Sequence, residues 1–260
     1  MSGPLPALVL AGSRPGGDPL AAHAGVSHKA LIEVDGRTMI ERVVGALAAA
    51  PEISRIVIAI ERPEVVGSLP GLHAPQCGKP VAFMPAGASP SASVAAALER
   101  EGTPLLATTA DHALLRADWV REFLAGCPAE ADAAVALARK EAVLAAAPGT
   151  QRTYLRFADG EFSGCNLFLF RRAPARGVVA LWREIEAQRK NPARMMLRLG
   201  IGWALRYRLG RLRLEDALAR LGALAGARLA MVTLSEGRAA IDVDKPADLA
   251  LVRTLAAREV

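Results

Sequence analysis

The chain has 260 residues, of which 52% are hydrophobic and only 4% aromatic, so its core must consist mainly of Ala, Leu and Val. This length suits one α/β domain, or one domain with an appendage, that buries a full core. No apolar run is long and uncharged enough to span a bilayer and the start lacks a signal-peptide pattern, which predicts a cytoplasmic protein. Three widely spaced cysteines argue against a disulfide framework and a zinc site, and we expect Cys77, Cys127 and Cys165 to be buried.

The net charge of +6 is concentrated in one region. Residues 171–213 hold 12 Arg and Lys and two Glu, a local charge of +10, so the rest of the chain sums to about −4. Between 189 and 213 the arginines alternate with Met, Leu, Trp and Tyr. Such a basic amphipathic segment can lie on a membrane surface or hold an anionic, partly apolar substrate, but it can equally pack on its own core or on a second subunit. No recognition motif accompanies the charge, so we expect no nucleic-acid partner.

The stretch 7–17 predicts a strand that leads into a flexible loop. Its apolar run ends in a small residue and a glycine, and the residues that follow are rich in Gly and Pro. Glycines let backbone amides approach an anion closely, and Arg14 and Lys29 add positive charge, which together indicate a phosphate cradle. The spacing is neither that of a P-loop nor that of the dinucleotide fingerprint, and an ordinary strand-to-helix loop is the alternative.

Hydrophobic periodicity predicts an alternation of strands and helices after this loop. We predict helices over 38–50, about 90–101, 117–124, 175–188 and 214–224 and after residue 246, and strands over 55–60, 81–84, 104–110, 133–137, 154–157, 162–170 and 228–233. The order strand, helix, strand at the start of the chain predicts a right-handed βαβ unit, and therefore a sheet with parallel strands.

Asp111 directly follows the apolar strand over 104–110. Ligands bind at the carboxyl edge of open α/β sheets, and carboxylate oxygens are the ligands that Mg²⁺ prefers, so we expect Asp111 to hold a metal ion. The alternative is an N-cap for the helix that begins near Ala117. We expect His112 to be structural rather than catalytic.

Five segments resemble the NTP transferase superfamily, which includes molybdenum cofactor guanylyltransferase, methylerythritol phosphate cytidylyltransferase and the sugar-phosphate nucleotidyltransferases. The matching residues are Leu10-Ala11-Gly12-x-Arg14 with Lys29-Ala30-Leu31, Gly87 with Ser93-Val94, Asp111 with Leu114-Leu115, Gly164-x-Asn166, and Ile241-Asp242-Val243-Asp244 with Pro246 and Asp248-Leu249. The resemblance implies a single α/β nucleotidyltransferase domain over 1–260, with a Rossmann-like (GT-A type), mostly parallel sheet flanked by helices. The unmatched residues 189–224 are expected to form a basic helical insertion within it.

The resemblance also implies a role for individual residues. The triphosphate would be held by Leu10, Ala11, Gly12, Ser13, Arg14 and Lys29, the base and ribose by Gly87 and Ser93, the acceptor by Gly164 and Asn166, and Mg²⁺ by Asp111 and Asp242. Lys29, Arg14, Asp111 and Asp242 would form the catalytic set, with Asp244 as an accessory ligand.

Two of these assignments have structural alternatives. A serine in the turn 85–94 can simply cap the following helix, and Gly164 can mark a strand bulge. In the cytidylyltransferase branch, acidic and basic residues usually stand between the positions that match Gly87 and Ser93, and this chain lacks them. The Gly-Pro-Leu-Ala-Gly turn of the guanylyltransferase branch is absent too, which favours CTP over GTP.

The implied activity is Mg²⁺-dependent transfer of a nucleoside monophosphate, CMP by preference, from an NTP to a phosphorylated acceptor with release of pyrophosphate. The acceptor would be a small molecule or a lipid-like alcohol phosphate. A homodimer and peripheral membrane contact through residues 189–213 both stay open. The rivals are a glycosyltransferase that uses a sugar nucleotide, which would ordinarily carry Asp-x-Asp where this chain has Asp111-His112-Ala113, and a non-catalytic nucleotide-binding or membrane-surface module.

Overall fold

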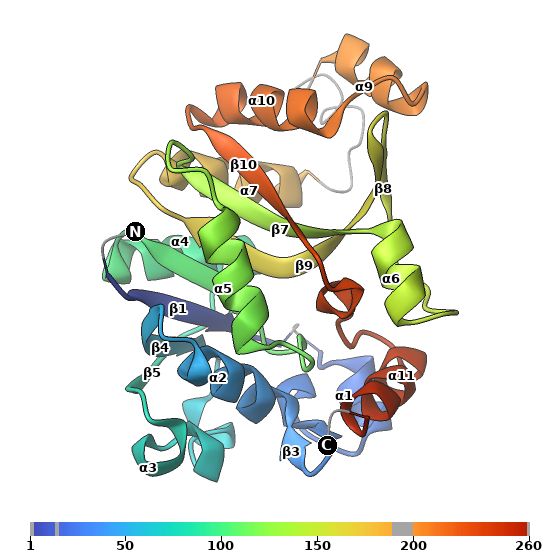
Figure 1. Ribbon diagram of the computed structural model, residues 1–260. Helices are drawn as coiled ribbons and strands as arrows, with labels where there is room; N and C mark the ends of the chain where they lie inside the picture. Colours follow the sequence, from blue (N-terminus) through green and yellow to red (C-terminus); the bar gives the residue numbers. More distant parts are fainter. Residues whose placement is uncertain (1–2, 14–15, 189–199, 259–260) are drawn as a thin grey trace.

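The computed structural model describes residues 3–13, 16–188 and 200–258, which form a central sheet with helices on both faces (Figure 1). The strands are β1 (Leu5–Leu10), β2 (Glu33–Val34), β3 (Arg37–Thr38), β4 (Ile53–Ala59), β5 (Val81–Met84), β6 (Leu105–Thr109), β7 (Ala133–Arg139), β8 (Leu155–Phe157), β9 (Gly160–Phe170) and β10 (Leu229–Leu234). The α-helices are α1 (Pro19–His23), α2 (Met39–Ala49), α3 (Ala74–Cys77), α4 (Pro90–Glu101), α5 (Ala117–Gly126), α6 (Lys140–Ala146), α7 (Ala175–Ala187), α9 (Ile201–Arg208), α10 (Leu214–Ala225) and α11 (Pro246–Ala256).

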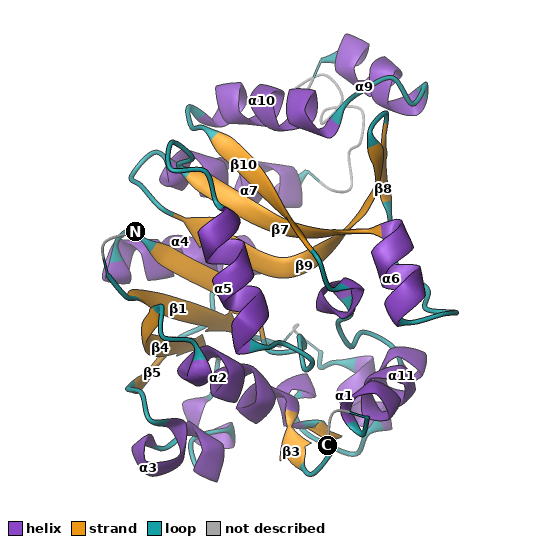
Figure 2. Ribbon diagram, in the orientation of Figure 1, coloured by secondary structure: helices purple, strands orange, loops and turns teal. Residues whose placement is uncertain are grey.

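The main sheet has the strand order β10-β7-β9-β6-β1-β4-β5, with β8 paired to β9. Strand β1 runs parallel to β4 and β6, β4 runs parallel to β5, and β7 runs parallel to β10. Strand β9 is antiparallel to both of its neighbours, β6 and β7. The predicted mostly parallel sheet with flanking helices is therefore confirmed (Figure 2).

The side chains of β1 alternate between the two faces of the sheet, as a strand covered on both sides requires. Ala7 and Val9 belong to the cluster that includes α2 and α5, whereas Leu8 belongs to the cluster that includes α4 and α7. Helix α2 begins at a capping box, in which Thr38 and Glu41 exchange hydrogen bonds, and it buries its apolar residues at helical spacing. The core is therefore divided into two layers by the sheet.

Short elements were not predicted from the sequence. Helix α6, the β2–β3 hairpin and the single 3₁₀ turn η1 (Lys29–Leu31) are brief segments that carry few periods of any hydrophobic pattern. All three cysteines are free and buried, as predicted. No helix in the described residues is long and apolar enough to cross a membrane.

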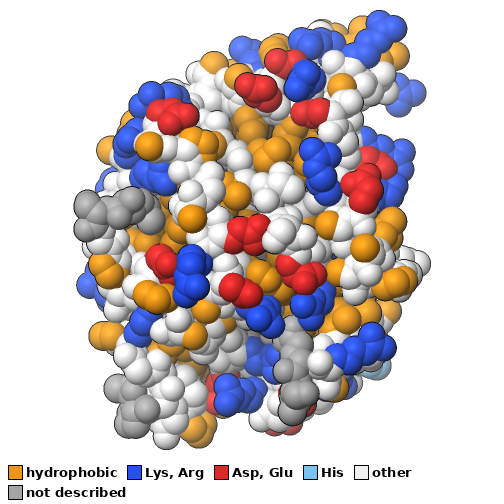
Figure 3. Space-filling view, in the orientation of Figure 1, with side chains coloured by type: hydrophobic (Ala, Val, Ile, Leu, Met, Phe, Trp, Pro, Cys, Tyr) orange, Lys and Arg blue, Asp and Glu red, His pale blue; other side chains and the backbone are white. Residues whose placement is uncertain are grey.

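Helices α9 and α10 lie at one end of the molecule, and α11 lies near the other (Figure 1). On the face drawn in Figure 3, Lys and Arg side chains gather over α9 at the top right. Residues 189–199, which belong to the predicted insertion, lie outside the described residues.

Candidate nucleotide-binding site

Lys29 lies between two carboxylates that come from distant parts of the chain. Its Nζ is 2.6 Å from Oδ2 of Asp111 and 2.7 Å from Oδ1 of Asp244. Asp111 follows β6 at the carboxyl edge of the sheet, and Asp244 precedes α11. Asp248 in the first turn of α11 accepts hydrogen bonds from the backbone amides of Asp244 and Lys245. These bonds hold the segment that carries Asp244 against the start of α11.

The charge environment keeps Lys29 protonated. Burial alone would lower the pKa of Lys29, but the charges and hydrogen bonds of Asp111 and Asp244 raise it above its ordinary value. The Lys29 side chain is 18% exposed, and its ammonium group is a fixed positive charge rather than a proton donor or acceptor at neutral pH.

Asp242 belongs to the same cluster. The backbone amide of Val243 donates to the carbonyl oxygen of Asp111 at 3.2 Å, which joins the two aspartate segments directly. Burial raises the pKa of Asp242, and the charges of Asp111 and Asp244 act in the same direction against the opposing charge of Arg152. Lys29, Asp111 and Asp242, which the sequence predicted to converge, therefore lie together in the structure.

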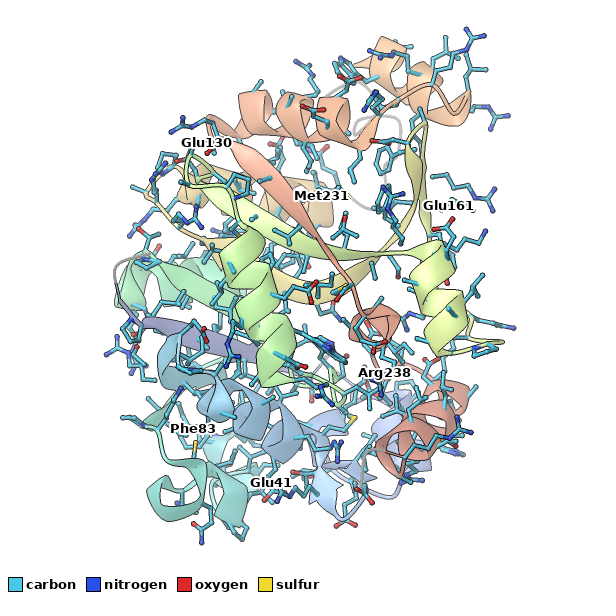
Figure 4. All side chains as sticks on the ribbon, viewed as in Figure 1. Glu41, Phe83, Glu130, Glu161, Met231 and Arg238 are labelled. Atoms are coloured by element: carbon cyan, nitrogen blue, oxygen red, sulfur yellow. The ribbon has the colours of Figure 1, made fainter. Side chains whose placement is uncertain are left out.

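Two further side chains hold the Asp242 carboxylate. Asn166 donates from Nδ2 to Oδ2 at 2.7 Å, and Arg152 forms an ion pair from Nη2 to Oδ1 at 2.5 Å. Asp242 comes shortly after η4 (Gly237–Ala240), the 3₁₀ helix that carries Arg238, labelled in Figure 4. The carboxylate is thus oriented from two sides by groups on different elements.

A bulge in β9 delivers Asn166. Val135 of β7 pairs with Phe168 and Leu137 pairs with Gly164, so β9 has two more residues than β7 over this interval. Asn166 has a positive φ of 50°, one that asparagine tolerates better than most residues. Gly164 is exposed at the bulge and a Cβ there would meet no atom within 4 Å. Gly164 therefore lies both at a strand bulge and on an open surface, the kind of surface that its predicted role toward the acceptor substrate requires.

The aspartate pair suits a magnesium ion. Among the described residues, Oδ1 of Asp111 is buried without a hydrogen-bond donor, whereas Oδ1 of Asp242 is held by Arg152. Mg²⁺ is commonly bound through one or two carboxylates together with substrate phosphates and water. No group of three or more His, Cys, Asp or Glu in the described residues could hold a metal ion. The chemistry therefore fits an ion shared with a bound phosphate chain.

The predicted phosphate loop begins at the same edge of the sheet. The amide of Ala11 donates to β4 at Ala59, and the carbonyl of Leu10 accepts from Ala110, so the loop starts between two neighbouring strands. Arg14 lies outside the described residues, and nothing in the structure bears on its predicted role.

Glu61 is a contact that the sequence did not reveal. Its Oε1 accepts a hydrogen bond from the amide of Ser13 at 2.7 Å, and the same oxygen would lie 3.1 Å from a Cβ at Gly12. Glu61 follows β4 at the edge that also holds Asp111, and this position after an apolar strand was the signal that could have found it. Arg152 lies in a loop without any motif, so no sequence pattern pointed to it.

The turn before α4 is held by its own side chains. The hydroxyl of Ser93 accepts from the amide of Gly87 at 2.9 Å and lies 3.2 Å from the carbonyl oxygen of Ser89, to which it donates. Ser89 is the N-cap of α4, as the alternative interpretation expected. A Cβ at Gly87 would lie 2.8 Å from Ala92, so the turn admits only glycine without rearrangement. The roles of Gly87 and Ser93 toward base and ribose stay predictions.

His112 is structural in its surroundings. It is buried and its ring stacks beside that of Trp119, with the centroids 6.2 Å apart. Burial lowers the pKa of His112 to about 4, so the ring is neutral in the folded protein.

Comparisons with known proteins agree with this architecture. A family model described as a MobA-like NTP transferase domain matches residues 7–221. A solved structure from Thermus thermophilus, described as a hypothetical transferase, is 32% identical with a TM-score of 0.80 over 95% of this chain and 99% of that chain. No curated protein matches the sequence.

Two more distant structures share the fold. The CMP:2-keto-3-deoxy-manno-octonic acid synthetase complexed with CTP is 17% identical with a TM-score of 0.58, and the match covers 100% of both chains. The 4-diphosphocytidyl-2C-methyl-D-erythritol synthase from Anaerococcus prevotii is 9% identical with a TM-score of 0.56, over 97% of this chain and 98% of that chain. At these identities the likeness concerns the fold alone.

Proposed function

Because the chain belongs to the family of MobA-like NTP transferases and is a nucleotidyltransferase, we propose that it moves CMP from CTP to a phosphorylated acceptor. We propose Mg²⁺ as the metal and pyrophosphate as the second product. The family membership sets aside the glycosyltransferase and the non-catalytic module. The observation that carries the proposal is the convergence of Lys29, Asp111 and Asp242 at the carboxyl edge of the sheet.

In the proposed reaction, a phosphate oxygen of the acceptor attacks the α-phosphorus of the triphosphate. The bond from that phosphorus to the bridging oxygen breaks, and pyrophosphate leaves with the electron pair. The acceptor oxygen is already anionic, so the protein needs no nucleophile of its own. Its task is to align two anions and to stabilise the charge that develops between them.

Each residue of the cluster has a defined part in this task. Lys29 would supply a permanent positive charge to the phosphates, and the amides of residues 10–13, with Arg14, would hold the rest of the triphosphate. Asp111 and Asp242 would hold Mg²⁺, which would neutralise part of the negative charge on the phosphates. Asn166 and Arg152 would keep the Asp242 carboxylate in one orientation.

The preference for CTP is supported by a hydrogen-bond acceptor beside the phosphate loop, the carboxylate of Glu61. A carboxylate oxygen can accept a hydrogen bond from the exocyclic amino group of cytosine, whereas uracil has a carbonyl oxygen at that position. Glu61 and Ala86 both lie beside Gly12 of the phosphate loop, since a Cβ at Gly12 would meet both side chains. CTP is also the nucleotide in the structure of the CMP:2-keto-3-deoxy-manno-octonic acid synthetase, which shares this fold.

The acceptor is proposed as a phosphorylated small molecule or a lipid-like alcohol phosphate. The exposed bulge at Gly164, next to Asn166, supports an open surface there for its phosphate end. The small size of glycine leaves this surface free of side-chain atoms.

The proposal is tested by measuring pyrophosphate release from ATP, CTP, GTP and UTP with Mg²⁺ and a panel of sugar, polyol and prenyl phosphates. We expect release with CTP and at least one acceptor, and a loss of about 10²–10³-fold in kcat for Asp111→Asn, as when one transition-state contact is removed. Asp118→Asn is the matched control, because Asp118 is an exposed carboxylate whose ion pair in the described part of the chain is with its neighbour Arg116. Full turnover by Asp111→Asn would refute the mechanism.

A further inference from the structure

Helix α9 presents an aliphatic stripe to solvent. Ile201, Leu205 and Leu209 are 67%, 54% and 56% exposed, and they are four residues apart, which places them along one side of the helix. No residue of α9 is buried. Soluble proteins commonly expose single apolar side chains, but a continuous aliphatic row on one helix marks a contact surface.

The opposite side of α9 is attached to the fold. The ring of Tyr207 meets Phe157 of β8 edge to face at 5.5 Å, and its hydroxyl accepts a hydrogen bond from the amide of Arg156 at 3.3 Å. The guanidinium of Arg206 lies over the ring of Trp203 and forms an ion pair with Asp216 at 3.2 Å. The aromatic side of the helix therefore faces the protein, which fixes the aliphatic stripe outward.

Positive charge borders the stripe. Residues 201–213 contain four arginines and no acidic residue. Arg206 has its partner in Asp216, whereas the exposed Arg208, Arg211 and Arg213 pair with no carboxylate among the described residues. Arg208 is three residues from Leu205, so it lies at the margin of the stripe. Figure 3 shows Lys and Arg side chains next to hydrophobic ones at the top right, where Figure 1 places α9.

We propose that α9 and the following residues to Arg213 dock this protein on an anionic phospholipid bilayer. Aliphatic side chains would enter the boundary of the acyl chains, and the arginines would meet lipid phosphates. A second copy of the chain fits less well, because a two-fold interface brings each patch against itself and would set these arginines against one another. Docking through this surface requires neither a bound nucleotide nor catalysis, so the proposal is independent of the transferase reaction.

The test is co-sedimentation of the full chain with vesicles of phosphatidylglycerol and phosphatidylcholine, and with vesicles of phosphatidylcholine alone. We expect binding to the anionic vesicles only, weakened by high salt. The triple variant Ile201→Ser/Leu205→Ser/Leu209→Ser should lose at least tenfold in vesicle affinity, and so should Arg208→Gln/Arg211→Gln/Arg213→Gln. Leu144→Ser is the matched control, because Leu144 is 39% exposed but lies on α6.

Circular dichroism and thermal unfolding check that the variants fold, which we expect because none of the six side chains is buried. Pyrophosphate release with a water-soluble acceptor should be the same in wild type and both triple variants. Wild-type protein that stays in the supernatant, or a triple variant that binds as well as wild type, would overturn the proposal. So would a wild-type dimer, measured by light scattering, that the serine variant dissolves while vesicle binding is absent.

Discussion

At the scale of single residues, the site is a set of charges that hold one another in place across long stretches of chain. Lys29 and Asp111 are 82 residues apart, and Lys29 and Asp244 are 215 apart. Each proposed metal-binding carboxylate is paired with a cation, Asp111 with Lys29 and Asp242 with Arg152. Such pairing lowers the cost of keeping two aspartates close together at neutral pH.

Asn166 offers a test of how the Asp242 carboxylate is positioned. Asn166→Gly and Asn166→Ala both remove the hydrogen bond to Asp242, so kcat should fall in both, by about 10-fold for one positioning contact. Only alanine opposes the positive φ, so its unfolding free energy should be lower than that of the glycine variant by about 1 kcal/mol. Steady-state kinetics and urea unfolding measure the two effects. Equal stability of the two variants would contradict the backbone argument.

His112 predicts a pH dependence of stability. Its pKa is about 4 in the folded protein and 6.5 when unperturbed, so between these values the unfolded chain binds the proton and the folded chain does not. The free energy of unfolding should therefore fall as the pH falls through this window, by up to about 3 kcal/mol. Urea unfolding at several pH values between 7.5 and 4.5 measures the slope.

Two variants isolate the histidine in that measurement. His112→Leu removes the titrating ring and should flatten the slope, whereas His73→Gln changes an exposed histidine and should leave it as in wild type. An unchanged slope in His112→Leu would assign the acid sensitivity to other groups.

At the scale of elements, the contact between α7 and α10 depends on one glycine. A Cβ at Gly177 of α7 would collide with the carbonyl oxygen of Ala225 at the end of α10. Gly177→Ala should therefore lower the unfolding free energy by about 1–3 kcal/mol. Gly45→Ala in α2 is the control, because a Cβ there meets nothing within 4 Å and alanine should raise helix stability by up to about 1 kcal/mol. Denaturant unfolding of both variants should show opposite signs, and a destabilised Gly45→Ala would contradict the comparison.

The long elements were predictable because their physics is local. Strands β4 and β6 are apolar runs covered on both faces, and α2 is indicated by the Thr38 cap and by apolar residues at helical spacing. Lys29, Asp111 and Asp242 were found because they stand in recognisable motifs at element ends. Arg152 was not, because its contact with Asp242 joins residues 90 apart and its loop carries no pattern. Contacts of that kind exist only once the sheet is assembled.

At the scale of the whole molecule, the site joins parts of the chain that no single element links. The proposed triphosphate contacts come from the first strand, the 3₁₀ turn at Lys29 and the end of β6, and Asp242 lies just before the last helix. The sheet order sets β1 between β4 and β6, which brings these ends to one edge. A ligand bound at the proposed site would contact both the start and the end of the fold, so its binding should stabilise the whole domain against unfolding.

CTP with Mg²⁺ should therefore raise the temperature of unfolding of the entire chain in one transition. A ligand at 100 times its dissociation constant stabilises a protein by about 2.7 kcal/mol, and for a domain of this size each kcal/mol raises Tm by roughly 2–4 °C, which gives about 5–10 °C. UTP should give a smaller shift, because it lacks the amino group proposed to meet Glu61. Asp242→Asn should lose most of the CTP shift in Mg²⁺, whereas Asp118→Asn should keep it. Differential scanning fluorimetry across the four triphosphates measures this, and a Tm that is raised equally by all four, or unchanged in every case, would contradict a CTP-selective site built on these carboxylates.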